Sequence, residues 1–171
     1  GDCYWVMVAV EAVDRQVVFA RSEDLKTWEH LSVFGPANAV EGVWECPDLF
    51  ELPIDGDAGN TRWVLVVNLN PGSAAGGSGG QYFVGHFDGV EFRPDPASAG
   101  HHLWLDWGRD HYAAVSYDNA PDGRRIMTAW MSDWTYALTV PTSGWRGNMT
   151  LPREVTLTDI DGRIELSQKA V

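Results

Sequence analysis

The sequence has few cysteines, few basic residues and no long apolar run. Its two cysteines, Cys3 and Cys46, allow at most one disulfide, and neither has the Cys or His neighbours of a zinc site. The 12 Lys and Arg residues stand against 24 Asp and Glu, a formal net charge of -12, which disfavours nucleic acids and anionic membranes as partners. No apolar stretch approaches the roughly 18 residues of a membrane span. A neutral ligand such as a sugar meets none of these obstacles.

Turn-forming and aromatic residues are abundant instead. The chain holds 18 Gly, 9 Pro and 9 Trp in 171 residues. Helical periodicity is nearly absent, and short β-rich runs alternate with turn signals. Asp-Gly pairs at 88–89, 122–123 and 161–162 are typical of hairpin turns, because Gly tolerates a positive φ. The sequence therefore predicts an all-β meander, with strands at 4–10, 16–20, 62–68, 81–87, 112–117, 125–131 and 154–157.

These runs repeat with a period of about 64 residues. An Asp-led turn followed four residues later by an aromatic occurs at Asp24 and again at Asp88, and an acid heads a strand at Glu45 and again at Asp110. Such a repeat predicts the four-stranded blades of a β-propeller, of which 171 residues supply about 2.7. Because a propeller needs at least four blades, we expect part of a propeller whose other blades lie outside this sequence. A complete sandwich of about ten strands is the alternative.

The heads of the innermost strands of a propeller meet at one mouth of its central channel. Glu45 and Asp110, as equivalent residues of successive blades, should therefore point into the same pocket. Two convergent carboxylates are what glycoside hydrolysis requires, because one protonates the leaving oxygen while the other attacks or stabilises the anomeric carbon. Taken alone, Glu45 is better explained as a solvent-exposed cap of a strand.

Motifs along the whole chain carry a resemblance to a known family. Residues 44–50 read Trp-Glu-Cys-Pro-Asp-Leu-Phe, and residues 79–89 read Gly-Gly-Gln-Tyr-Phe-Val-Gly-His-Phe-Asp-Gly. Further motifs follow the same order at 68–72, 107–114, 126–134 and 142–154. Together they resemble glycoside hydrolase family 32, the invertases, inulinases and levanases, with the first motif similar to the sequence around that family's acid/base glutamate. The 79–89 motif favours the levanase and exo-inulinase branch over invertase.

The resemblance implies a fold, a reaction and a set of residues. The fold is a five-bladed β-propeller followed by a C-terminal β-sandwich, with residues 1–171 as the C-terminal part of the propeller and the N-terminal blades and sandwich absent. The reaction is a retaining hydrolysis that releases fructose from β-fructans (levan or inulin) or sucrose, with Glu45 as general acid and then general base. Asp110, Trp134, Trp44 and Cys46 would bind the substrate. No cofactor and no metal are implied.

Two catalytic motifs of the family are not found in the chain. The family's nucleophile lies in a Trp-Met-Asn-Asp-Pro-Asn-Gly-like motif and its transition-state aspartate in an Arg-Asp-Pro element, and neither string occurs here. With one catalytic acid of three, the isolated chain is predicted to be inactive. A non-catalytic carbohydrate-binding propeller and a fructosyltransferase of the same family are the alternatives. The compartment is undetermined, with a secreted or periplasmic location favoured over the cytoplasm.

Two local features have competing interpretations. The His and Asp residues at 101–111 could be taken for a metal site, but the neighbouring glycines and the Leu-Trp-Leu run indicate loop and strand, so we expect no metal there. The Gly-rich stretch 71–80 lacks the Gly-Lys-[Ser/Thr] of a phosphate-binding loop and is expected to be a flexible connection between strands.

Overall fold

The computed structural model describes residues 4–98 and 100–171, and Cys3 therefore lies outside it. All seven expected strands are confirmed, and the fold of the described residues is all-β. Within these residues no helix is long and apolar enough to cross a lipid bilayer. The strands are β1 (Trp5–Glu11), β2 (Gln16–Ser22), β3 (Glu29–Phe34), β4 (Val43–Ile54), β5 (Asp57–Asn70), β6 (Gly79–Phe87), β7 (Phe92–Pro94), β8 (Leu103–Trp104), β9 (Tyr112–Tyr117), β10 (Arg125–Trp130), β11 (Arg153–Ile160) and β12 (Arg163–Ala170), with 3-10 turns η1 (Pro96–Ser98) and η2 (Pro121–Gly123).

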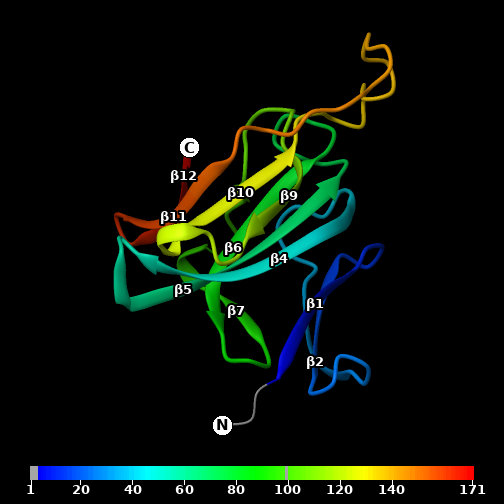
Figure 1. Ribbon diagram of the computed structural model, residues 1–171. Helices are drawn as coiled ribbons and strands as arrows, with labels where there is room; N and C mark the ends of the chain where they lie inside the picture. The colour runs from blue at the N-terminus through cyan, green and yellow to red at the C-terminus, as the bar shows by residue number, and fades with distance from the viewer. Residues whose placement is uncertain (1–3, 99) are drawn as a thin grey trace.

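The strands form three successive antiparallel meanders, which we call the first, second and third blades (Figure 1). The first blade is β1-β2-β3, the second is β4-β5-β6-β7, and the third is β9-β10-β11-β12. Strand β8 pairs with the opposite end of β6 from β7, so the outermost strand of the second blade is interrupted. A single parallel pair, Leu157 with Ile54, joins β11 to β4. This topology confirms the predicted blades and excludes a sandwich.

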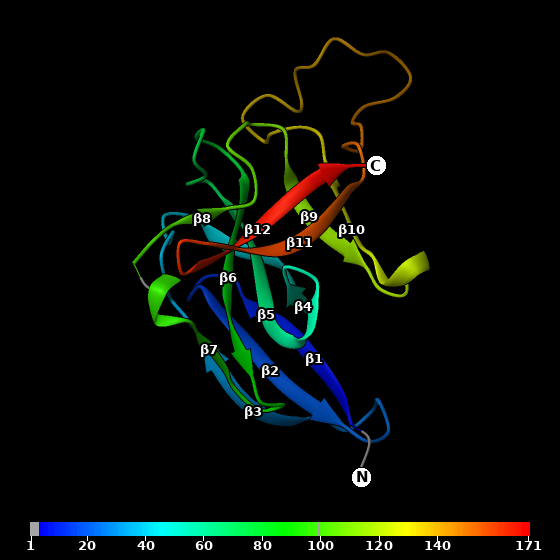
Figure 2. The same cartoon turned by 90° about the vertical axis from the view of Figure 1, so that its left-hand side faces the viewer.

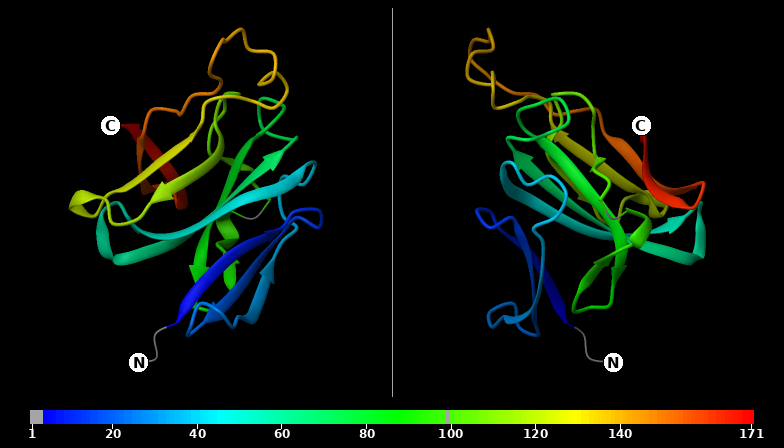
Figure 3. Two further views of the ribbon diagram at one scale, coloured as in Figure 1. Left: turned by 45° about the vertical axis from the view of Figure 1, so that its right-hand side comes forward. Right: turned by 180° about the vertical axis from the view of Figure 1, so that it is seen from behind.

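The sheets of the blades lie face to face (Figure 3). Two layers of buried apolar side chains lie between them. Along β5, Val64 and Val66 pack in the layer toward the third blade, while Leu65 and Val67 pack in the layer toward the first blade. All four side chains are fully buried. Because side chains alternate across a strand, a strand covered on both faces needs the continuous apolar run that the sequence provides here. The second blade is thus a central slab between its two neighbours.

An aspartate begins the hairpin that joins the two outer strands of each blade. Asp24 Oδ1 accepts the amides of Lys26 and Thr27 at 2.8 and 2.7 Å, and Asp88 Oδ1 accepts those of residues 90 and 91 at 2.9 and 2.8 Å. In the third blade, Asp159 accepts the amide of residue 162 at 2.7 Å. The backbone hydrogen bonds lower the pKa of both Asp24 and Asp88 to about 2. The Asp-led turn is therefore a true structural repeat.

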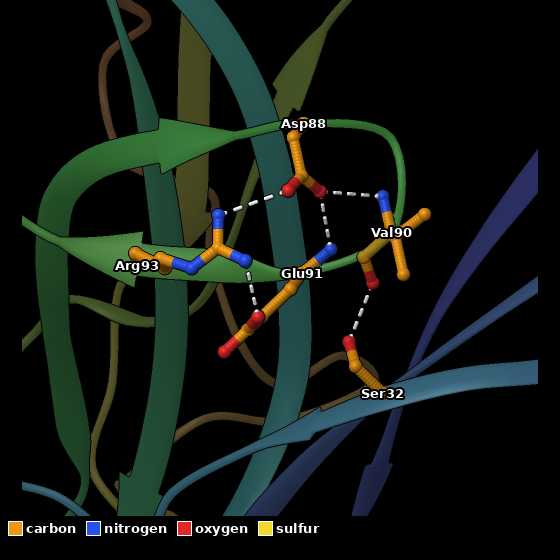
Figure 4. Close-up of polar contacts among 5 residues, drawn as sticks. All are labelled: Ser32, Asp88, Val90, Glu91 and Arg93. Carbon is orange, nitrogen blue, oxygen red and sulfur yellow. Dashed lines mark hydrogen bonds and ion pairs between the residues drawn. The ribbon is translucent and has the colours of Figure 1, made fainter.

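The Asp88 turn also contacts the neighbouring blade (Figure 4). Ser32 of β3 donates its hydroxyl to the carbonyl oxygen of Val90 at 2.5 Å. Within the turn, Arg93 pairs with Asp88 at 2.9 Å and with Glu91 at 2.5 Å. Exposed ion pairs of this kind contribute little stability, so the turn's shape depends mainly on the backbone bonds accepted by the aspartate.

The blades do not close into a ring within the described residues, as expected of part of a propeller. Strand β1 is an edge strand, with Trp5 58% exposed. Strand β9 is the edge strand of the third blade, and its side chains Val115 and Tyr117 are exposed. These apolar side chains lie where the faces of further blades would pack.

Candidate active site

A β-bulge at the start of β4 presents Glu45. Glu45 pairs with Asn68 of β5, but the next pair is Asp48 with Val66, so the register slips between them. Cys46 has a φ of 46°, and Pro47 cannot donate to the ladder. An extra residue in one strand bends it and redirects the adjacent side chains. Glu45 is consequently only partly buried at the strand head, and Cys46 is exposed beside it.

The third blade contains the same bulge, and it identifies a partner for Glu45 that the sequence analysis missed. Tyr112 of β9 pairs with Trp130, the register then slips, and Ala113 has a φ of 54°. Tyr112 is therefore the structural equivalent of Glu45. Its hydroxyl donates a hydrogen bond to Glu45 Oε2.

Asp110 is not equivalent to Glu45, so that part of the prediction was wrong. It lies two residues before Tyr112 in the exposed loop that leads into β9. There it lines a hollow of about 490 Å³ with Met131 and Arg153, which neither Glu45 nor Trp134 lines. The prediction relied on the 65-residue spacing between Glu45 and Asp110. The bulges, however, set the register of the inner strands, and they make Tyr112 the equivalent of Glu45. Contact of Asp110 with a sugar stays a prediction.

Buried polar side chains fasten the two bulged strands to each other. The Asn68 side chain, fully buried, donates to the carbonyl oxygens of Cys46 and Ala114 at 3.0 and 3.3 Å and accepts the Ala114 amide at 3.1 Å. Asp48 Oδ2 accepts the amide and the hydroxyl of Ser116 at 2.8 and 2.6 Å. Satisfied buried networks of this kind fix a local geometry. Glu45 thus projects from a rigid double bulge.

Burial keeps both polar neighbours of Glu45 protonated. Burial, reinforced by the hydrogen bond to Glu45, raises the pKa of Tyr112 well above its usual range, so its hydroxyl remains a donor. Although Cys46 is exposed, partial desolvation by the surrounding groups, and then the nearby Glu45 charge, raise the pKa of its thiol. Cys46 is therefore a thiol and not a thiolate nucleophile. Its predicted contact with substrate stays a prediction.

A chain of aromatic contacts connects Trp134 to Tyr112, the partner of Glu45. Its ring lies 4.9 Å from that of Trp130, and Trp130 lies 6.3 Å from Tyr112. Trp134 is nevertheless 50% exposed, so one face remains available. An exposed indole can cover the apolar C–H patches of a sugar ring.

A fully buried carboxylate holds the Trp134 loop in place. Asp133 accepts the Ser78 amide at 3.0 Å and the Thr135 amide and hydroxyl at 2.8 and 2.6 Å. Ser78 Oγ in turn accepts the Trp134 amide at 3.2 Å. The Gly-rich stretch 71–80, expected to be flexible, is therefore anchored at its C-terminal end against this loop.

Trp44 does not take part in the site, which corrects the prediction that it binds substrate. Its side chain is fully buried between the first and second blades, and its indole nitrogen donates to the Ala39 carbonyl at 2.9 Å. Neighbouring side chains in a strand point to opposite faces. Glu45 faces outward, and Trp44 therefore faces the core. Trp44 has a packing role.

The fold and this site define a class of protein: part of a β-propeller domain that presents a carboxyl group at the head of an inner strand and carries an exposed indole in the loop that follows β10. Residues 1–170 match the family "Glycosyl hydrolases family 32 N-terminal domain", and the chain belongs to this family. The predicted family is thereby confirmed. Among the described residues, no three His, Cys, Asp or Glu side chains gather as ligands for a metal ion.

Three relatives show how far the similarity extends. The chain is 46% identical over 172 residues to a levanase of Bacillus subtilis (strain 168), covering 98% of the chain and 25% of the levanase. It is similar to the crystal structure of an exo-inulinase from Aspergillus awamori, with a TM-score of 0.91, 39% identity, and coverage of 98% of the chain and 33% of the inulinase. A β-fructofuranosidase from Schwanniomyces occidentalis, solved with fructosyl-erythritol, has a TM-score of 0.89 and 35% identity, with 98% and 33% covered. The chain therefore spans a quarter to a third of these relatives.

Proposed function

We propose that the chain is part of the catalytic propeller of a glycosidase that releases fructose from β-fructans, levan or inulin, or from sucrose. The observation that carries this proposal is Glu45, which projects from the bulge of β4 and accepts the Tyr112 hydroxyl near the exposed Trp134. Relatives named levanase and exo-inulinase, and the fructosyl-erythritol complex of a third, support the substrate class.

In this proposal Glu45 is the general acid and then the general base. It donates its proton to the glycosidic oxygen as the leaving group departs, and as a carboxylate it takes a proton from the water that releases fructose. Tyr112, a permanent donor, holds one oxygen of the carboxyl group and leaves the other free for proton transfer. Trp134 supplies a wall for the sugar, and Asp110 and Cys46 are proposed as further contacts.

The proposed reaction is completed by residues outside this chain. A retaining hydrolysis needs a second carboxylate as nucleophile, and the family's nucleophile and Arg-Asp-Pro motifs do not occur here. We therefore propose that residues 1–171 act together with further blades and a β-sandwich, and that the isolated chain is inactive. Fructosyl transfer, which would use the same acid/base, is the second candidate within the family.

A chimera tests the function. Replacing the matching segment of the Bacillus subtilis levanase with residues 1–171 should give a protein that releases fructose from levan, inulin or sucrose. Glu45→Gln in this chimera should lower kcat by about 100-fold or more, because it removes the transferable proton. The control Glu51→Gln changes an exposed acid on the same strand and should leave kcat unchanged.

Several outcomes decide between the alternatives. A folded chimera whose kcat is unaffected by Glu45→Gln would overturn the assignment of the acid/base. A folded chimera that binds inulin but releases no fructose would favour a non-catalytic binding propeller. Oligosaccharide products at high sucrose concentration would favour a transferase. Fructose release by the isolated 171 residues, abolished by Glu45→Gln, would show that the missing blades are dispensable.

A further inference from the structure

The segment between β7 and β9 carries an exposed tryptophan that the proposed catalytic site does not use. Trp107 is 75% exposed. It follows β8, which lies at the outer edge of the second blade (Figure 2). Nearby, the rings of His102 and Trp104 meet edge to face at 5.5 Å. Most of the indole surface of Trp107 is therefore open to contact with a ligand.

His102, Trp104 and Trp107 line two adjoining hollows. One has a volume of about 490 Å³ and is completed by residues 38–41 and 72–74. The other, of about 370 Å³, continues toward Arg163, Glu165 and Gln168 of β12. The three aromatic residues are common to both hollows, which therefore adjoin at these side chains. We refer to the two hollows together as the groove.

The polar groups of the first hollow suit a neutral, hydroxyl-rich ligand. Glu41 is exposed and can accept hydrogen bonds from two neighbouring hydroxyls. Ser73 also lines this hollow, and its hydroxyl donates to the Gly76 carbonyl oxygen at 3.0 Å, so it can still accept a hydrogen bond from a ligand. Asn38 is fixed by its bond to the His101 carbonyl oxygen at 2.8 Å, which holds the two sides of the hollow together. No Lys or Arg lines this hollow, so an anionic ligand would lack a counter-charge. An indole face with acceptors around it matches a sugar.

The groove lies at the same end of the blades as Glu45. Glu41 precedes Glu45 by four residues, so their Cα atoms lie at most about 14 Å apart. Trp107 precedes β9 in the connection that leads to Tyr112, the partner of Glu45. The first hollow is lined only by the second blade and its two connections, away from β1 and from the exposed side of β9. The first hollow is therefore separate from the edges at which the ring of blades is open.

We propose that Trp107, with Glu41 and His102, forms a binding site for the chain of a fructan polymer, separate from the point of cleavage. The site holds sugar units of a long substrate while its terminal unit is at Glu45. This inference rests on the proposed function for its ligand. Sucrose has a single glucose unit beyond its fructosyl unit and so has no chain of further sugar units to place in this site.

The experiment compares polymer with disaccharide in the levanase chimera. Trp107→Ala should lower kcat/KM for inulin and levan by about five- to tenfold, the scale of one aromatic contact, and leave kcat/KM for sucrose unchanged. Glu41→Ala should act in the same direction. Trp28→Ala, an exposed tryptophan in the β2–β3 hairpin at the opposite end of the blades, is the matched control and should change neither substrate.

A binding measurement separates this inference from the catalytic one. In the Glu45→Gln background, electrophoresis through a gel that contains inulin should retard the chimera, and Trp107→Ala should reduce the retardation. If Trp107→Ala lowers kcat/KM equally for inulin and sucrose, or for neither, the groove is not a binding site for the polymer. A lower melting temperature with unchanged retardation would also refute it, since Trp107 would then pack against another part of the protein. If the chimera with Glu45 intact is retarded by inulin but releases no fructose, only the proposed catalysis is refuted.

Discussion

At the scale of single residues, the site depends on the pairing of Glu45 with Tyr112. A hydrogen bond to a charged group contributes about 1.5–3 kcal/mol, mostly by fixing position. The sequence indicated Glu45 through its motif but gave no sign of Tyr112, because the two are 67 residues apart and meet only across neighbouring blades. The signal that could have found Tyr112 was its place in the 107–114 motif, two residues after Asp110.

Tyr112→Phe tests this pairing. The substitution keeps the ring packed against Trp130 and removes only the hydroxyl, so kcat of the chimera on sucrose should fall about tenfold with little change in KM. Tyr117→Phe, on the same strand and 55% exposed, should have no effect. An unchanged kcat for Tyr112→Phe would mean that Glu45 is oriented without it.

At the scale of elements, two devices shape the site: the bulges of β4 and β9 and the anchored loops around Asp133. The sequence predicted β5, β6 and β10 well because their apolar residues run continuously or alternate. It indicated a strand headed by Glu45 but not the extent of β4, whose two prolines and scattered acids interrupt the strand pattern. Its extent is decided by pairing with β5, a contact between segments and not a property of either.

Gly77→Ala tests the anchored loop. A Cβ at Gly77 would lie 2.3 Å from Asp133 Oδ2, and the residue has a φ of +74°, so we expect a loss of about 1–3 kcal/mol in the free energy of unfolding. Because Trp134 depends on this contact, KM for sucrose should rise. Gly76→Ala is a matched control: it has a φ of +78° but its nearest neighbour would be 3.7 Å away. Equal melting temperatures for the two variants would argue against the clash with Asp133.

At the scale of the whole molecule, acid should weaken the packing of the blades. His111 is 1% exposed, and neither ring nitrogen has a hydrogen-bond partner among the described residues. Burial, and then the charge of Arg153, lowers the pKa of His111 from 6.5 to about 4. The unfolded chain takes up this proton near pH 6.5 and the folded chain only near pH 4, so folding is progressively disfavoured as the pH falls between these values, by about 3 kcal/mol in all.

His111→Gln removes this titration. The free energy of unfolding in urea should then fall less steeply from pH 7 to pH 4 than in the parent protein, by about 3 kcal/mol over the range. His30→Gln, at an exposed position of β3, should leave the slope unchanged. Identical slopes for the parent and His111→Gln would show that the buried imidazole does not control acid stability.

The sequence by itself determined the blades and the family. Asp24 and Asp88 mark equivalent turns because each aspartate satisfies its own turn's amides, a local interaction that leaves a trace at fixed spacing. The motif around Glu45 likewise identified the family. Only the tertiary structure decided which neighbours of Glu45 share its surroundings. The matching bulges of β4 and β9 bring Tyr112 to Glu45. Strand alternation buries Trp44, and Asp110 lies in the loop before β9. The structure decided these placements because pairing between distant segments sets the register, and with it the face that each side chain occupies.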